Sequence, residues 1–192
     1  FRRVLFRSNT VNLHKNTGRV GSRSFGGDGE LFNIGDKIVH PMHGAGVVDG
    51  IVEEKVNGTT RQYYVLNLPV GGMVIKVPTA TSQDIGMRGI IDDKRADEVL
   101  ASIATAEVDM TSNWNKRYRE NVLRIKSGDL DEVVKVVKGL MLRELQHGLS
   151  TGERKMLHNA KQILISELVL AKNCSYEDVE NKINSVFASV SA

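Results

Sequence analysis

The sequence has little of several residue types, and each shortage excludes a class of protein. The 192 residues include one cysteine, Cys174, which excludes an internal disulfide framework and any cysteine-cluster zinc site. Aromatic residues make up only 5% of the chain, so the core must be mostly aliphatic. No apolar run approaches the roughly 18 residues that a membrane-spanning helix needs. We therefore expect a protein without a membrane span, in a reducing compartment such as the cytoplasm.

The first 30 residues differ in composition from the rest of the chain. Residues 1–29 hold six basic residues and one acidic residue, Asp28, whereas the remainder is close to balanced. The segment has no apolar periodicity and is rich in Arg, Ser, Asn and Gly, which is typical of chain that does not fold. We expect residues 1–30 to be a disordered or non-native extension. The formal net charge of +3 is therefore no argument by itself for nucleic-acid binding.

Short runs of β-branched and aromatic residues alternate with turn residues between positions 31 and 90. Asn57-Gly58 lies between two such runs and is a strong hairpin signal, because both central positions of the turn need positive φ. All three prolines of the chain fall at ends of runs, where a missing N–H does least harm. The pattern predicts a small, strongly bent SH3-like barrel over residues 31–90, with strands at 38–39, 47–48, 51–52, 63–66 and 73–77.

Residues 91–192 contain no proline and show helical periodicity. Ser150 and Glu153 form a capping-box pattern, and Asp129 is a candidate N-cap for the helix before it. We predict an α+β fold in which the β barrel is followed by an all-α domain over residues 91–192. The expected helices cover 92–104, 113–126, 129–147, 150–172 and 175–190, and their apolar positions, including Leu145, are expected to form the core.

Two segments superficially resemble ligand sites. His40 and His43 lack a third metal ligand at a convincing spacing, so a turn and packing role is favoured. The glycines around Ala45 are followed by a strand, whereas a phosphate-binding loop needs a helix there. No acidic cluster with histidine shows the spacing of a metal or acid–base centre. We expect no metal, no cofactor and no enzymatic activity.

The segment 113–126 is unusually basic and contains the only tryptophan, Trp114. It holds five basic residues against one acidic residue, Glu120. This pattern suits phosphate contacts by the cations with an aromatic wedge at a base step. The alternative is a tryptophan that packs between domains beside a solvated charged face, and residue chemistry alone does not decide. A second basic pair, Arg154-Lys155, opposes the dipole of its helix and could hold a phosphate with the helix amides.

Three stretches of the sequence together resemble the CarD/CdnL family of bacterial transcription regulators. They are LFNIGDKIVHPMHGAGVV at 31–48, TSNWNKRYR at 111–119 and GLSTGERKML at 148–157. The similarity covers residues 31 to about 172 in order. The first stretch alone is less specific, because the transcription-repair coupling factor shares this module.

The resemblance implies a Tudor-like domain that binds the β-subunit lobe of RNA polymerase and a helical domain on promoter DNA. It implies that Trp114 wedges into the minor groove at the upstream edge of the transcription bubble and stabilises the open complex. It further implies a cytoplasmic, nucleoid-associated protein that acts as a monomer on the holoenzyme. The cations implied to face DNA phosphates are Lys116, Arg117, Arg119, Arg154 and Lys155.

The resemblance also implies a polymerase-binding surface on the β module. The basic residue before Val-Pro in the last long strand is Lys76, and Arg61 is a second candidate. This sequence departs from the family at Glu53-Glu54, where relatives can place a basic contact, so Glu54 is counted as an altered part of the surface. The rival hypothesis is a general nucleic-acid or scaffold module unconnected to initiation, which would need the basic helix but not Lys76.

Overall fold

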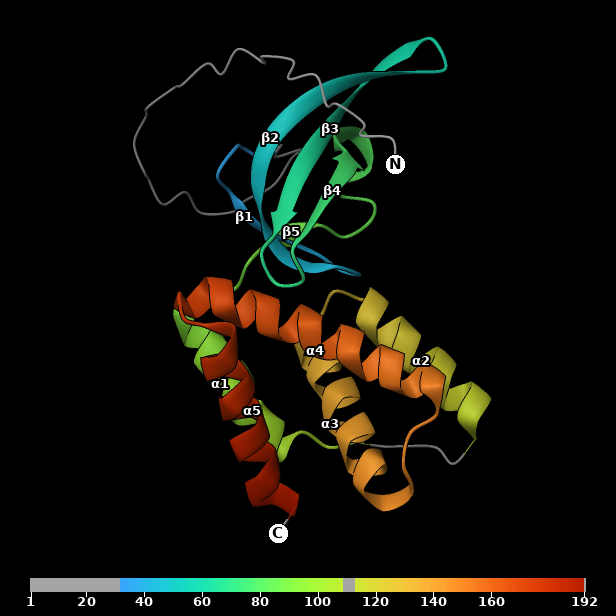
Figure 1. The fold of residues 1–192 in the computed structure, drawn as a ribbon, viewed down its shortest axis with the longest axis vertical. Coiled ribbons are helices and arrows are strands. Elements are labelled where there is room, and N and C mark those ends of the chain that lie inside the picture. The colour runs from blue at the N-terminus through green and yellow to red at the C-terminus, as the bar shows by residue number, and fades with distance from the viewer. Residues whose placement is uncertain (1–31, 109–112, 192) are drawn as a thin grey trace, which may run out of the picture. The chain divides into compact units, whose positions relative to one another are not determined.

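The computed structural model describes residues 32–108 and 113–191, with the side chains of 189–191 left out. Within these ranges a five-stranded sheet is followed by five α-helices, so the predicted α+β class is confirmed (Figure 1). The extension expected over residues 1–30 lies outside the described residues. The order of elements matches the change from short β-branched runs to helical periodicity near residue 90. The division into two domains at that point stays a prediction.

The sheet is antiparallel throughout and has the strand order β4-β3-β2-β1-β5. Asn57 and Gly58 form the tight turn between β2 and β3 with φ of 50° and 81°, as the hairpin signal predicts. The runs predicted at 47–48 and 51–52 belong to one long strand, because a bulge between Val48 and Gly50 bends the strand without ending it. The strands are β1 (Lys37–His40), β2 (Gly44–Val56), β3 (Thr59–Leu68), β4 (Met73–Pro78) and β5 (Arg88–Gly89), with a short 3-10 helix η1 (Thr79–Thr81) after β4.

One face of the sheet buries a small apolar core. Tyr64 is fully buried there and its ring meets Phe32 edge-on, with the ring centroids 5.7 Å apart. The Tyr64 hydroxyl accepts a hydrogen bond from the Phe32 amide at 3.0 Å, so the buried phenol is satisfied. The buried members of this core are Ile38, Val48, Tyr64, Leu66, Val77 and Met87.

The helices begin close to the predicted positions because their N-caps are encoded in the sequence. Asp92, Asn113 and Ser150 each accept a hydrogen bond from the backbone amide three residues later. The capping box of Ser150 and Glu153 is formed in full, as predicted. The helices are α1 (Asp93–Thr105), α2 (Trp114–Lys126), α3 (Leu130–His147), α4 (Thr151–Lys172) and α5 (Tyr176–Ser191).

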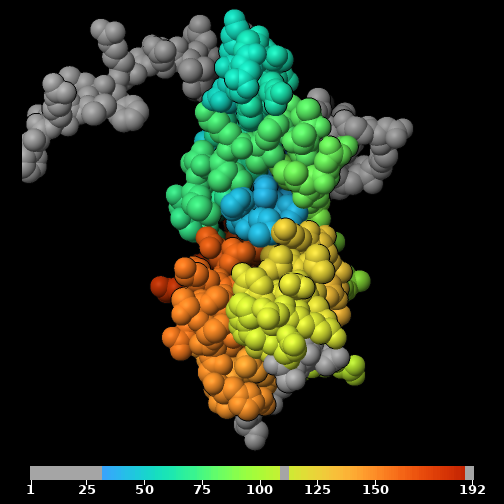
Figure 2. All heavy atoms as spheres, turned by 90° about the vertical axis from the view of Figure 1, so that its right-hand side faces the viewer, coloured from blue at the N-terminus to red at the C-terminus, as the bar shows by residue number. Residues whose placement is uncertain are grey.

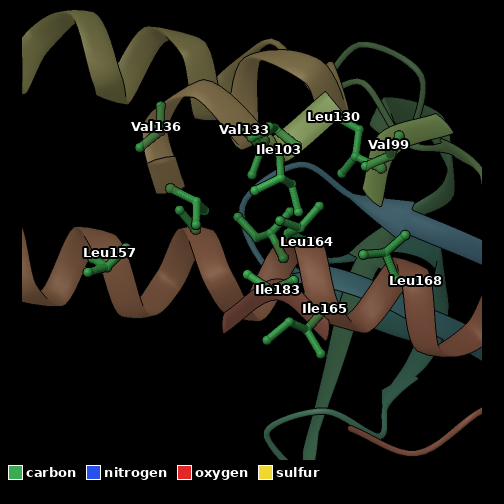
Figure 3. Close-up of a cluster of buried hydrophobic side chains, with 14 of the residues drawn as sticks. Val99, Ile103, Leu130, Val133, Val136, Leu157, Leu164, Ile165, Leu168 and Ile183 are labelled. Atoms are coloured by element: carbon green, nitrogen blue, oxygen red, sulfur yellow. The ribbon is translucent and has the colours of Figure 1, made fainter. Parts of the chain in front are cut away.

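A second, larger core lies among the helices. Figure 3 shows apolar side chains from α1, α3, α4 and α5 pointing toward one another. The prediction that Leu145 belongs to this core is wrong, because its side chain is 67% exposed. Residues 144–148 are all exposed, so the last turn of α3 projects from the core. Among the described residues, no helix combines the length and apolarity needed to cross a membrane.

Helix α4 contacts both the sheet and the other helices α1, α3 and α5 (Figure 1). The turn between β1 and β2 packs against it, and the Ala45 amide donates to Ser166 Oγ at 2.8 Å in a buried position. Gly44 has φ of 89°, and a Cβ there would lie 2.4 Å from Ser166 Oγ, so only glycine fits. Residues 41–43 form a turn after β1, in which His40 Nδ1 accepts a hydrogen bond from the Met42 amide. Among the described residues, no three His, Cys, Asp or Glu side chains come together in a way that could hold a metal ion.

Candidate nucleic-acid interface

Trp114 is the first residue of α2 and is held by a hydrogen bond while half of its surface stays open. Its indole Nε1 donates to Ser150 Oγ at 3.1 Å, and its side chain is 44% exposed. The ring stacks on Tyr118 of the next turn, with centroids 5.3 Å apart and planes 24° from parallel. The indole is therefore fixed in direction at the surface, unlike a tryptophan buried between packed domains.

The N-terminal turns of α2 and α4 lie side by side. Trp114 contacts the N-cap Ser150 and Arg117 contacts Glu153, so two hydrogen-bonded pairs join the first turns of the two helices. Figure 2 shows the two segments adjacent on one face of the molecule. Each helix start carries partial positive charge from the amides of its first turn, which favours a negative group nearby.

The aromatic pair of Trp114 and Tyr118 lies near the first turn of α4. A Cβ placed on Gly152 would lie 3.8 Å from Trp114 and 3.7 Å from Tyr118, which is ordinary van der Waals contact. The first turn of α4 thus approaches both rings closely enough that an added methyl group at position 152 would touch them without a clash.

Four of the predicted phosphate contacts are exposed on the two helices that carry this site. Lys116 and Arg119 lie on α2, and Arg154 and Lys155 lie on the first two turns of α4. Lys116 has a loose partner in Glu120, with Nζ and Oε1 3.8 Å apart. Such an exposed pair is worth little, so the cation stays available to a phosphate.

The interpretation of Arg117 as a phosphate contact needs correction. Its side chain is 2% exposed, and its Nε and Nη2 donate to Glu153 Oε1 at 2.9 and 2.6 Å. The buried face of α2 consists of Arg117, Asn121 and Ile125, spaced one turn apart. Arg117 therefore joins α2 to α4 and does not face solvent.

Glu153 is the buried anion at the centre of this site. It is 3% exposed and accepts hydrogen bonds from Arg117, from the Ser150 amide at 3.1 Å and from the Ser150 hydroxyl at 2.8 Å. Arg143 of α3 adds an ion pair, with Nε 3.4 Å from Oε1. Burial alone would raise the pKa of the Glu153 carboxyl, but the hydrogen bonds from Arg117 and Ser150 outweigh it and lower the pKa. The capping-box spacing identified Glu153 in the sequence, but that spacing does not indicate its ion pair with Arg117.

The predicted polymerase residues lie together on the sheet. Glu54 of β2 is opposite Arg61 of β3, and Lys76 of β4 reaches across to form an ion pair with Glu54. Alternation along the strands puts all three on the face opposite to buried Tyr64. Glu54 thus pairs with Lys76 and lies opposite Arg61, so it adds a negative charge to this face, which keeps both of its cations.

Comparisons with known proteins agree with the resemblance seen in the sequence. The family model described as "CarD-like/TRCF RID domain" matches residues 32–91, and "CarD, C-terminal domain" matches residues 98–184. "Putative transcription factor YdeB" of Bacillus subtilis (strain 168) is 33% identical over 151 residues, covering 79% of this chain and 99% of that protein. The first match also confirms the Tudor-like character of the sheet. On these matches, which span both the sheet and the helices, the chain belongs to the CarD family.

Proposed function

We propose that this chain regulates transcription by binding the β-subunit lobe of RNA polymerase and stabilising the promoter open complex with Trp114. Membership of the CarD family supports the general role, as does the relative whose name describes a transcription factor. The observation that carries the specific role is the fixed, half-exposed indole of Trp114 beside exposed cations of α2 and α4.

The wedge would act on distorted DNA. An aromatic ring entering the minor groove needs a widened or unstacked step, and the edge of a melted bubble already offers one. Lys116, Arg119, Arg154 and Lys155 would hold the flanking phosphates. Such contacts carry no direct base readout, so specificity would come from deformability and from the position of polymerase.

The sheet would act as the tether. Its face carrying Lys76, Arg61 and Glu54 would bind polymerase and raise the local concentration of the DNA-binding half near the promoter. Because the wedge binds the open state better than the closed state, it would shift the equilibrium between them. A difference in affinity of about 1.4 kcal/mol would change that equilibrium tenfold. This role requires no catalysis, and we expect no enzymatic activity.

The test is the lifetime of the open complex on a promoter with purified bacterial RNA polymerase. The comparison includes no added protein, the wild type and Trp114→Ala. Tyr176→Ala is the matched control, because Tyr176 is likewise an exposed aromatic at the first position of a helix. We expect the wild type and Tyr176→Ala to lengthen the lifetime and Trp114→Ala to lose most of that effect.

Two results would reject the proposal. An unchanged lifetime with the wild type, together with DNA binding equal to that of Trp114→Ala, would favour a general nucleic-acid module. Equal effects of Trp114→Ala and Tyr176→Ala would show that the wedge does not carry the function.

A further inference from the structure

The Ser150 hydroxyl uses its full hydrogen-bonding capacity. It donates to Glu153 Oε2 at 2.8 Å and accepts from the Trp114 indole at 3.1 Å and from the Glu153 amide at 3.3 Å. A serine hydroxyl has one donor and two acceptor lone pairs. The three partners therefore fix its rotation.

The direction of these bonds depends on Glu153. A carboxylate only accepts, so the hydroxyl must point its hydrogen at Glu153, and its lone pairs then face the indole N–H and the Glu153 amide. If the side chain at position 153 donated a hydrogen bond to Ser150 Oγ instead, three donors would face the two lone pairs of that oxygen. The Trp114 indole would then compete with the other two donors for its acceptor.

Glu153 also binds α2 directly. The other carboxylate oxygen binds Arg117, which lies one turn after Trp114 on α2. Two links therefore join the same two turns, one through the indole and one through the guanidinium. Both end at Glu153, directly or through Ser150.

Building on the proposed function, we propose that Glu153 is a positioning residue for the Trp114 wedge. It would contact no DNA, because its side chain is buried. It would set the orientation of the indole through the Ser150 hydroxyl and hold α2 in place through Arg117. The exposed cations would govern affinity, while Glu153 would govern the geometry of the ring.

Glutamine at 153 is the informative substitution. It keeps the size of the side chain and is accepted in capping boxes, so α4 should still begin at Thr151. Donors nevertheless approach both oxygens of the carboxylate, from Arg117 on one side and from Ser150 on the other. Either orientation of the amide places its NH2 group against a donor. Glu153→Gln should therefore loosen the indole without unfolding the helix.

Trp114 is the only tryptophan of the chain, so intrinsic tryptophan fluorescence reports on this ring alone. We would measure acrylamide quenching and fluorescence anisotropy of the full chain, with circular dichroism as the check on folding. For Glu153→Gln we expect a roughly twofold increase in quenching and lower anisotropy with unchanged helix content. In the open-complex assay we expect about a fivefold loss of the lifetime gain, the size of effect expected from one hydrogen bond.

Asp178→Asn is the matched control. Asp178 takes part in the same reciprocal arrangement at the start of α5, accepting from the Ser175 hydroxyl at 2.7 Å and donating its amide to it at 3.1 Å. This change removes an equivalent capping charge away from Trp114. It should leave quenching, anisotropy and open-complex lifetime at wild-type values.

The two readouts separate this inference from the proposed function. If Trp114→Ala lengthens the open-complex lifetime as much as the wild type does, the proposed function fails, while the fluorescence of Glu153→Gln still tests the positioning of the ring. Wild-type quenching and anisotropy in Glu153→Gln would overturn the positioning role. So would equal changes in Asp178→Asn. If Glu153→Gln fails to fold, Ser150→Gly gives the test instead, because glycine is a tolerated N-cap and the change removes the hydroxyl through which Glu153 would orient the indole.

Discussion

Arg88 of β5 and Glu167 of α4 form a two-point ion pair where the sheet meets the helices. Nη1 and Nη2 of Arg88 lie 2.6 and 3.0 Å from the two oxygens of Glu167, whose side chain is fully buried. The Ile91 amide donates to the same carboxylate at 3.1 Å, and Arg88 also donates to the Gly128 carbonyl at 3.0 Å. The edge strand, the chain leading to α1 and the turn before α3 are thereby fixed to α4.

Removing Arg88 should be costly for stability. Arg88→Met leaves the buried Glu167 carboxylate without its cation, and such losses cost about 3–5 kcal/mol. Urea unfolding followed by circular dichroism measures the change. Arg95→Met is the control, since Arg95 pairs with exposed Glu98 and Asp131 and should cost less than about 1 kcal/mol. Equal losses in the two variants would contradict this account of the junction.

The local features of the fold could be predicted from the sequence. Asn57-Gly58 needed positive φ for a hairpin, and Ser150 with Glu153 needed only the spacing of a capping box. These signals act over a few residues, so they survive in any tertiary context. The bulge that joins two short runs into β2 left no comparable signal.

The burial of Arg117 could not be predicted in this way. Hydrophobic periodicity finds the buried face of a helix by its apolar residues, but the buried face of α2 begins with arginine and asparagine. Glu153, 36 residues later, supplies the countercharge that makes the burial of Arg117 tolerable. Leu145 shows the converse, because its spacing fits the core while the last turn of α3 projects beyond it.

His40 should make stability depend on pH. Burial, and then the neighbouring His43, lower the pKa of His40, although a backbone hydrogen bond opposes them. The folded state therefore favours the neutral ring. The contribution of neutral His40 to the free energy of unfolding is complete above the ordinary histidine pKa of about 6.5. This contribution is lost as the pH falls through the lower pKa of the folded state.

The variant that isolates this effect is His40→Asn. Asparagine can accept the hydrogen bond from the Met42 amide that His40 Nδ1 accepts at 3.1 Å, but it does not titrate. The free energy of unfolding, measured in urea between about pH 7 and 5, should fall less in the variant than in the wild type. An identical fall in both proteins would show that His40 does not carry the dependence.

Salt should reveal the phosphate contacts. Arg154→Ala should weaken binding to promoter DNA in the polymerase complex and reduce the slope of log affinity against log salt by about 1. Lys94→Ala is the control, because Lys94 is exposed on α1, away from Trp114 in the chain. Titrations at several salt concentrations measure both slopes. An unchanged slope for Arg154→Ala would remove this residue from the interface.

The polymerase surface can be tested by reversing one charge. Lys76→Glu should weaken binding to purified RNA polymerase by about tenfold or more, since two like charges would then face each other at Glu54 and the surface would lose a cation. Lys55→Glu makes the same change on the opposite face of the β2–β3 hairpin. It should bind like the wild type. Equal weakening by both variants would point to net charge and not to a defined face.

The most direct test of the central claim is open-complex lifetime measured as a function of protein concentration. The claim is that the sheet tethers the protein while Trp114 stabilises the open state. Lys76→Glu should therefore need more protein but reach the wild-type lifetime, because its wedge is intact. Trp114→Ala should saturate near the lifetime seen without added protein. If Trp114→Ala instead reaches the wild-type lifetime at saturation, the wedge is not what stabilises the open complex and the account is contradicted.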